Sequence, residues 1–405
     1  MQETWKTYKL GEIVDNIFSG GTPNTTISDY WDGDYSWLSS GETRNKYIVK
    51  TEKKITEKGI KESSTRLGLQ NDIVIASAGQ GFTRGQTSYL LIDTYINQSL
   101  LAVRSNPDII SSKFLFFNLS TRYFELRNLS DDNSSRGSLT TKLLKILEVS
   151  LPSLQTQNKI AEILSSLDDK IELNNQMNQT LEEMAQAIFK EWFIDFKFPG
   201  SDGELVDGLP TGWRMGKVGN LIKILNGFAF KSKDFKVNGK YGVIKIKNIS
   251  NGKVDIENTQ FVDDAVDRFR VQGNDVLIAM TGAEVGKIGI VPKNDKDLFL
   301  NQRVGKFQSI LEENKWYTYL FLTSPIIQNL LFNTASGSAQ PNISGSQIEN
   351  LDILLPDNVI LNDFNKIVNE LFTRINQNDF NNYVLKGLRD SLLPKLMSGK
   401  IDVKQ

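Results

Sequence analysis

Apolar residues recur at alternating spacings of four and three along the stretch from Gln155 to Trp192. This is a heptad pattern, which places the apolar side chains on one face of a helix. Pro199 and Gly200 are the first residues to interrupt it, so the pattern predicts one helix of roughly 57 Å. A helix with such a stripe buries it against a partner helix. The apolar positions are Ile160, Leu164, Leu167, Ile171, Leu181, Ala185, Ile188 and Trp192.

The predicted partner is the stretch from Phe364 to Leu396, which repeats the pattern about 204 positions later. Two Asn positions inside the first pattern are repeated as well. Antiparallel packing would bring these amides together, and paired buried Asn side chains would fix the register of the helices. Pro394 predicts a kink or a break in the last turn of the second helix. The expected neighbours are Asn174 with Asn382, and Asn178 with Asn378.

The repeat continues outside the helices. Asn71–Gly79 matches Asn274–Gly282, and Leu151-Pro152 matches Leu355-Pro356. Short β runs precede a long helix in both copies, so the sequence predicts an α+β fold with two mixed α/β globular domains related by an internal repeat, and two long antiparallel coiled-coil helices. The expected boundaries are 1–154 for the first globular domain, 155–198 for the first helix, 199–354 for the second globular domain and 355–405 for the second helix.

Within each globular domain the pattern predicts a buried strand, a helix and then a polar loop. The strands are expected at Asp72–Ser77 and Asp275–Met280. The helices are expected near Ser112–Leu129 and Trp316–Phe332.

Composition excludes several kinds of chemistry. The chain of 405 residues contains no Cys and no His, which removes disulfides, thiolate chemistry, Ser-His-Asp triads and His-ligated zinc. We see neither a transmembrane run nor a signal peptide, which favours a cytoplasmic protein without a membrane partner. Gly282–Lys287 resembles a phosphate-binding loop, but its glycines have the wrong spacing and Ile288 replaces the magnesium-binding hydroxyl. We therefore expect no catalytic residue, metal or cofactor in this chain.

Charge is distributed unevenly although the formal net charge is only −1. A positive segment occurs in each copy, at Arg44–Arg66 and at Lys231–Lys253. One such segment would be an ordinary solvated surface, but its repetition favours DNA binding.

A family resemblance is carried by the order of several motifs. These are Ser19-Gly-Gly-Thr-Pro23 with Tyr30-Trp31, Asn226–Lys233, Leu151–Gln157, the heptad helix ending at Phe193, and Leu209-Pro-Thr-Gly-Trp213. Together with the duplication, they make the whole chain similar to the specificity subunits of type I restriction-modification enzymes.

The resemblance implies two target recognition domains, each reading one half of a bipartite double-stranded DNA site, and a helix pair that acts as a spacer. It also implies two modification subunits that use S-adenosylmethionine to methylate adenine, and a restriction subunit with ATP-driven, magnesium-dependent activity. This chain would supply specificity and no catalysis. The alternative is a protein-binding scaffold without DNA specificity, in which the coiled coil is the working surface.

Candidate DNA contacts come from the positive segments and from matched loops in the two copies. Base edges are read by Arg, Lys, Asn, Gln and Ser, whereas Lys and Arg also bind phosphates. Arg84 and Lys287 follow the matched buried strands within glycine-containing loops. The full set is Arg44, Lys46, Arg84, Ser135, Arg136, Ser138, Lys231, Lys245, Lys247, Lys287, Ser338 and Gln340.

The first helix ends with more aromatic residues than one seam can bury. Phe189, Trp192 and Phe193 are therefore candidates for a modification-subunit interface, or alternatively for packing against the chain's own globular domain.

Overall fold

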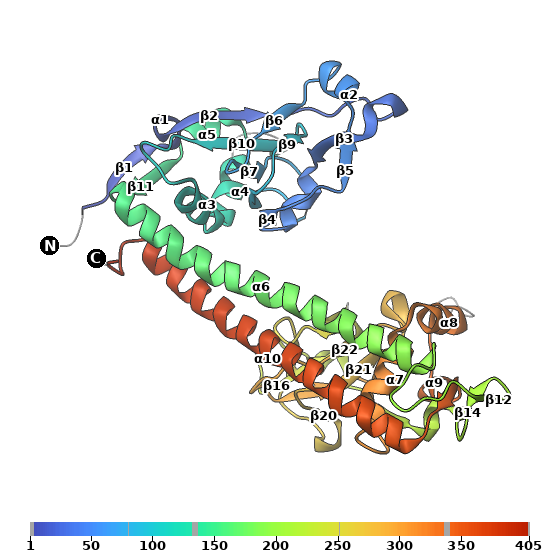
Figure 1. Cartoon of the computed structure of the whole chain (residues 1–405). Helices are drawn as coiled ribbons and strands as arrows, with labels where there is room; N and C mark the ends of the chain where they lie inside the picture. The colour runs from blue at the N-terminus through green and yellow to red at the C-terminus, as the bar shows by residue number, and fades with distance from the viewer. Residues whose placement is uncertain (1–3, 80, 132–136, 251, 336–340, 404–405) are drawn as a thin grey trace. The chain divides into compact units, whose positions relative to one another are not determined.

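The computed structural model describes residues 4–79, 81–131, 137–250, 252–335 and 341–403. The chain divides into two compact units (Figure 1). Unit 1 consists of residues 1–169 and 385–405, and unit 2 consists of residues 170–384. Each long helix therefore begins in one unit and ends in the other. No helix in the described part of the chain is long and apolar enough to span a membrane.

In the described part of unit 1, a five-stranded sheet has the order β2-β10-β7-β8-β4. Its central strand β7 pairs antiparallel with both β10 and β8. All four residues of β7 are buried, which explains its unbroken apolar sequence. The strands are β2 (Val14–Ser19), β4 (Tyr47–Ile48), β7 (Ile73–Ala76), β8 (Thr87–Leu90) and β10 (Leu100–Ser105).

A four-stranded sheet of order β5-β3-β9-β6 completes the main body of unit 1. Its two central strands, β3 and β9, run parallel. A two-stranded ribbon of β1 and β11 leads into the first long helix. The strands are β1 (Lys6–Lys9), β3 (Trp31–Leu38), β5 (Lys53–Ile55), β6 (Arg66–Gly68), β9 (Thr94–Ile96) and β11 (Glu148–Leu151).

The helix predicted at Ser112–Leu129 is two helices, so that prediction of a single helix is wrong. Helix α3 ends at Ser120 and α4 begins at Tyr123, after the Thr121 hydroxyl has bonded the Asn118 carbonyl. A Thr hydroxyl that bonds the preceding turn competes with continuation of a helix. The helices of unit 1, besides the long ones, are α1 (Leu10–Ile13), α2 (Glu57–Lys61), α3 (Ser112–Ser120), α4 (Tyr123–Asp131) and α5 (Thr141–Lys145).

Unit 2 repeats this plan with one more strand in its larger sheet and an added ribbon of β12 and β13, which confirms the predicted duplication. In its described part, a six-stranded sheet has the order β15-β24-β21-β22-β18-β17, and a four-stranded sheet has the order β19-β16-β23-β20. The central pair β16 and β23 is parallel, as is its counterpart in unit 1. The strands are β12 (Leu205–Val206), β13 (Leu209–Pro210), β14 (Arg214–Lys217), β15 (Ile222–Asn226), β16 (Tyr241–Ile244), β17 (Ile249–Ser250), β18 (Gly252–Val254), β19 (Gln260–Val262), β20 (Arg270–Val271), β21 (Val276–Ala279), β22 (Ile288–Ile290), β23 (Leu298–Leu300), β24 (Val304–Ser309) and β25 (Asp352–Leu355).

The second predicted short helix is also divided. Pro325 divides it, because the residue before a proline avoids the helical region of backbone angles. Ser324 is accordingly extended, with φ −63° and ψ 144°. Pro325 then begins the next helix, where a proline is tolerated. The helices are α7 (Asn314–Thr323), α8 (Pro325–Ala335) and α9 (Gly345–Glu349).

The long helices are α6 (Leu154–Phe193) and α10 (Asn358–Met397), and they end five and eight residues before the ends of the predicted segments 155–198 and 355–405. The predicted break at Pro394 is absent, because α10 continues through that residue to Met397. In unit 2 the second half of α6, green in Figure 1, lies beside the first half of α10, drawn in red. The two segments are antiparallel, since residue numbers rise along one helix as those of its contacts fall along the other.

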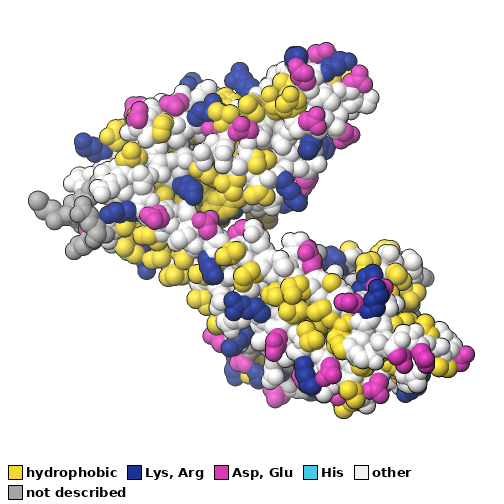
Figure 2. Space-filling view, viewed as in Figure 1, with side chains coloured by type: hydrophobic (Ala, Val, Ile, Leu, Met, Phe, Trp, Pro, Cys, Tyr) yellow, Lys and Arg dark blue, Asp and Glu magenta, His cyan; other side chains and the backbone are white. Residues whose placement is uncertain are grey.

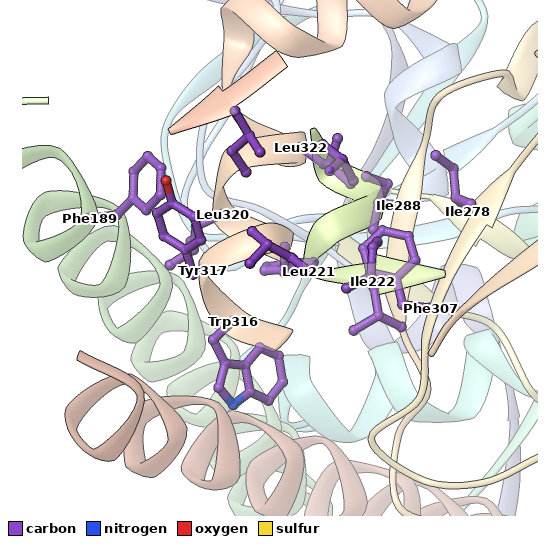
Figure 3. Close-up of a cluster of buried hydrophobic side chains, with 14 of the residues drawn as sticks. Phe189, Leu221, Ile222, Ile278, Ile288, Phe307, Trp316, Tyr317, Leu320 and Leu322 are labelled. Carbon is purple, nitrogen blue, oxygen red and sulfur yellow. The ribbon is translucent and has the colours of Figure 1, made fainter. Parts of the chain in front are cut away.

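Each unit has a core that includes residues of both long helices. In unit 1, Ile160 and Leu164 of α6 pack with Leu396 of α10 and with α3. In unit 2, Phe189 of α6 lies beside Tyr317 of α7, with ring centroids 5.6 Å apart (Figure 3). Each globular domain is therefore joined to the helix pair by a continuous apolar core.

Candidate DNA interface

Four Asn side chains meet inside the helix pair of unit 2, which confirms the antiparallel neighbours expected from the sequence. Asn174 Nδ2 donates to Asn382 Oδ1 at 2.8 Å, and Asn378 Nδ2 donates to Asn178 Oδ1 at 2.8 Å. All four side chains are buried. A shift of one helix along the other would leave these amides without partners, at a cost of about 1–3 kcal/mol each.

The positive segment of unit 1 forms the edge of the four-stranded sheet and the turns that lead into it. Arg44, at the end of a short 3₁₀ turn, is exposed and forms an ion pair with Glu52 at 2.5 Å. Lys53 and Lys54 of β5 and Arg66 of β6 are also exposed. These side chains can approach an anionic surface without breaking the core.

Lys46 belongs to the same segment but is half-buried and ion-paired within its own unit, and its contact with DNA stays a prediction. Its Nζ lies 2.6 Å from a carboxylate oxygen of Asp168 on α6, and the Tyr47 hydroxyl donates to the same oxygen at 2.7 Å. Arg389 of α10 donates to the other oxygen of Asp168 at 2.7 Å. Lys46 therefore connects the first globular domain to the helices.

The charges around Asp168 follow from this geometry. Burial alone would raise the pKa of Asp168, but the Lys46 ammonium and hydrogen bonds from Lys46, Arg389 and Tyr47 lower it below its ordinary value. Burial lowers the pKa of Lys46 against the opposing pull of Asp168. Burial and the Asp168 carboxylate both raise the pKa of Tyr47, which stays a neutral hydrogen-bond donor.

Arg84 is also buried rather than exposed, contrary to the expectation from its glycine-containing loop. Its guanidinium donates to the carbonyl of Gly137 and to the carboxylate of Asp131. Arg84 thus holds together the residues on either side of 132–136. Ser138 is half-buried, and its hydroxyl lies 3.4 Å from the Ser77 carbonyl, which accepts the hydrogen bond. Ser135 and Arg136 lie outside the described residues.

In unit 2, Lys231 and Lys247 are exposed as expected, whereas Lys245 is half-buried. Lys245 Nζ donates to Gln260 at 2.5 Å and lies 3.2 Å from the centroid of the Phe235 ring. Burial, assisted by Lys247, lowers the pKa of Lys245. Ser338 and Gln340 lie outside the described residues.

Lys287 is half-buried and forms an ion pair with Glu284, three residues earlier. It lines a cavity of about 400 Å³ together with Glu182 of α6 and Tyr319 of α7. Burial raises the pKa of Glu182. Lys287 therefore lies in the predicted loop and faces the helices of its own unit, and its contact with DNA stays a prediction.

Aromatic side chains beside the cations are the feature that sequence reasoning missed. In unit 1, Lys53 Nζ lies 5.4 Å from the Trp31 ring, which packs edge-on against Trp37. In unit 2, the guanidinium of Arg270 lies 5.0 Å from the Phe299 ring. These pairs belong to matching four-stranded sheets. The cation and the ring of each pair come from different strands, so no pattern within a single strand could have revealed them.

The two units present basic residues mixed with acidic ones. On the face shown in Figure 2, Lys and Arg are interspersed with Asp and Glu. Such a surface suits selective binding better than indiscriminate attraction to polyanions.

The aromatic end of α6 is buried, which corrects its assignment to a partner interface. Phe193 is 3% exposed and packs against Tyr317 with ring centroids 4.5 Å apart, and Phe189 and Trp192 are buried in the same core. The alternative prediction, packing against the chain's own domain, is confirmed.

The protein has two similar domains, each with its own basic segment, and a helix pair whose register is fixed by Asn side chains. These features define a protein with two recognition units joined by a shared helical element. Residues 2–183 and 210–386 match the family described as "Type I restriction modification DNA specificity domain". The matches cover most of the chain, and the protein belongs to this family.

Curated relatives agree along nearly the full length. The MjaIX specificity subunit of Methanocaldococcus jannaschii is 29% identical, over 99% of this chain and 94% of the relative. The HindI specificity subunit of Haemophilus influenzae is 25% identical, over 98% of this chain and 99% of the relative. The solved S subunit of a type I system from M. genitalium has the same fold, with a TM-score of 0.62, 15% identity and coverage of 97% of this chain and 96% of that chain.

Proposed function

We propose that each unit reads one half of a bipartite double-stranded DNA site, in the cytoplasm, for a type I restriction-modification complex. The observation that carries the proposal is the duplication: both units contain a corresponding pair of sheets, and each has its own basic segment. Two similar domains that read independently would give a site with two separately specified halves. The scaffold alternative gives no reason for a basic segment in both copies.

Catalysis is assigned to partner subunits. Two modification subunits would bind S-adenosylmethionine and methylate adenine, and a restriction subunit would use ATP and magnesium. The described residues contain no cluster of three or more acidic side chains arranged to hold a metal ion. We place no cofactor in this chain.

The contacts divide into two classes. Exposed Arg44, Lys231 and Lys247 are proposed to bind phosphates. Arg136 and Gln340 are proposed to read bases, because guanidinium and amide groups can bond two base-edge atoms at once. Arg84 is buried, and Lys46 and Lys287 are half-buried and paired with carboxylates, so these three residues are proposed to support the surfaces that bind DNA.

The test is methylation profiling over a randomised bipartite library by the reconstituted complex. Arg136→Ala should change base preference in the first half-site only, and Gln340→Ala in the second only, at about 1–3 kcal/mol for a lost base contact. Lys247→Ala should weaken binding uniformly and reduce the salt slope by about one. Equal changes in both half-sites after a single substitution would contradict independent reading. Binding that does not depend on salt would favour the scaffold.

A further inference from the structure

The cavity that Lys287 lines in unit 2 contains two polar groups without a partner. Glu182 of α6 and Tyr319 of α7 both line this space of about 400 Å³. Tyr319 is 5% exposed, and within the described part of the chain neither its hydroxyl nor the Glu182 carboxylate forms a hydrogen bond or an ion pair. Polar groups withdrawn from water are normally paired. The cavity therefore lacks a group that would complete its hydrogen bonds.

The charges around the cavity show which kind of group is missing. Lys287 already pairs with Glu284. Lys253 likewise pairs with Asp379, with its Nζ 2.9 Å from the carboxylate. Glu182 has no ion pair with any described residue. Burial raises the pKa of Glu182, and the opposing attraction of Lys253 does not cancel that effect. An uncompensated carboxylate beside an unpaired phenol suits a cation that donates hydrogen bonds.

The internal repeat identifies the residue of unit 1 that corresponds to this place. Strands β4 and β18 are equivalent, because each runs parallel to the second strand of the central hairpin, β8 or β22. Through these strands, the registers align Tyr47 of β4 and Lys253 of β18 with matched residues of β7 and β21. The residues that precede them are Lys46 and Gly252. Gly252 in unit 2 therefore occupies the position of Lys46 in unit 1.

In unit 1 that position supplies a cation. The Lys46 ammonium lies 2.6 Å from the Asp168 carboxylate of α6 and 4.9 Å from the centroid of the Phe117 ring. Phe117 and Tyr319 are equivalent, because each is the sixth residue of its helix, α3 or α7. The ammonium group thus contacts both a carboxylate of a long helix and an aromatic ring. Unit 2 has a long-helix carboxylate and the equivalent ring, but not the ammonium group.

Gly252 explains why unit 2 does not supply this cation itself. Glycine has no side chain, and a Cβ built on Gly252 would lie 3.5 Å from the Tyr319 hydroxyl and 4.0 Å from a Glu182 carboxylate oxygen. The position is therefore directed at both unpaired groups. Its φ of +76° lies in the left-handed region, which favours glycine over residues that carry a side chain. The backbone conformation at this point keeps the cavity open.

We propose that the cavity beside Gly252 binds a guanidinium or ammonium group from outside the chain, in the place that Lys46 fills in unit 1. The Glu182 carboxylate would form the ion pair, and the Tyr319 hydroxyl would accept a hydrogen bond. Phe372, which also lines the cavity, provides an aromatic ring for the cation. The volume of about 400 Å³ lies within the range of small-molecule sites, roughly 300–1,000 Å³. The site belongs to unit 2 alone and does not depend on the proposed DNA recognition.

Isothermal titration calorimetry of the full chain with ethylguanidinium tests the site, and ethylurea is the uncharged match of this probe. Ethylguanidinium should bind one site per chain and raise the Tm, whereas ethylurea should do neither. Glu182→Gln should weaken binding about ten-fold or more, because it removes the charge from the hydrogen-bond acceptor. Tyr319→Phe should weaken binding about three-fold, as expected for one neutral hydrogen bond.

The natural cation is either a free small molecule or a side chain of a bound protein, and a second titration distinguishes these sources. Ethylguanidinium is titrated into the chain after saturation with its cognate modification subunit. Exclusion of the probe from this complex would support an arginine or lysine side chain of the partner as the occupant. Unchanged binding would support a free cation such as a polyamine.

Glu183→Gln is the matched control, because Glu183 is exposed on α6 and accepts a hydrogen bond from Gln179 at 2.9 Å. This variant should bind ethylguanidinium as tightly as the wild type. Melting curves of the same samples show that each variant is folded. Equal affinity of Glu182→Gln and the wild-type chain for ethylguanidinium would overturn the proposal. Equal binding of ethylurea, or no binding of ethylguanidinium to the wild-type chain, would overturn it as well.

Discussion

Removing the Asp168 carboxylate should destabilise unit 1 while leaving unit 2 unchanged. Asp168 receives hydrogen bonds from Lys46, Tyr47 and Arg389, and its side chain is 4% exposed. Asp168→Ala would leave two cations facing each other and a phenol without its acceptor. Loss of one partner from a buried ion pair costs about 3–5 kcal/mol.

The magnitude here should lie at the lower end of that range. The Lys46 side chain is 31% exposed and that of Arg389 is 19%, so water can solvate part of the uncompensated charge. We expect a loss of about 3 kcal/mol. For a unit of roughly 190 residues, this corresponds to a fall in Tm of about 6–12 °C.

Differential scanning calorimetry of the full chain is the assay, and the neighbouring exposed Asp169→Ala is the matched control. Asp168→Asn should fall between the two, because its amide oxygen still accepts hydrogen bonds. Asp168→Ala combined with Lys46→Met should recover part of the loss, since it removes one orphaned cation. A fall for Asp168→Ala no larger than for Asp169→Ala would refute the reasoning.

Three further outcomes are expected. Asn178→Leu should lower the free energy of unfolding by about 1–3 kcal/mol, because it leaves the Asn378 amide unpaired. The double change Asn178→Leu/Asn378→Leu should recover stability in urea unfolding but loosen the register of the helices, which cysteine cross-linking would show. Burial raises the pKa of Glu182, so its carboxylate costs stability at neutral pH; Glu182→Gln should raise the Tm at pH 7, and a gain that persists unchanged below pH 4 would contradict this explanation. Inserting one heptad of seven residues into both α6 and α10 should lengthen the spacer between half-sites without changing either half, and an unchanged methylation pattern would show that the helices do not set the spacing.

The features that were predictable from the sequence are those that repeat. The spacing of apolar residues and the internal duplication together predicted the long helices, the Asn pairs and the buried strands β7 and β21. The helices and strands follow from the periodicity of buried apolar positions, which can be read from one sequence. The four-stranded sheets were missed, because strands such as β5 and β6 are three residues long and pair with strands distant in the sequence.

The candidate site was less predictable for an electrostatic reason. Arg84 and Lys46 have the sequence context of exposed loop cations, but their partners Asp131 and Asp168 lie 47 and 122 residues away. The sequence provides no signal for such pairings. Pro325, by contrast, was visible in the sequence, and its restriction on Ser324 was enough to predict the division between α7 and α8.

Unit 1 is built from two segments, residues 1–169 and residues 385–405, and this has a consequence for biosynthesis. Unit 2 is one continuous segment, so a nascent chain can complete it before residues 385–403 have left the ribosome. Until then Ile160 and Leu164 of α6 lack the cover that Leu396 and its neighbours provide. A polypeptide released early would therefore expose an apolar strip on α6, the kind of surface that chaperones and proteases recognise. Closure of unit 1 by α10 thus makes synthesis as far as this helix a condition for a stable unit 1.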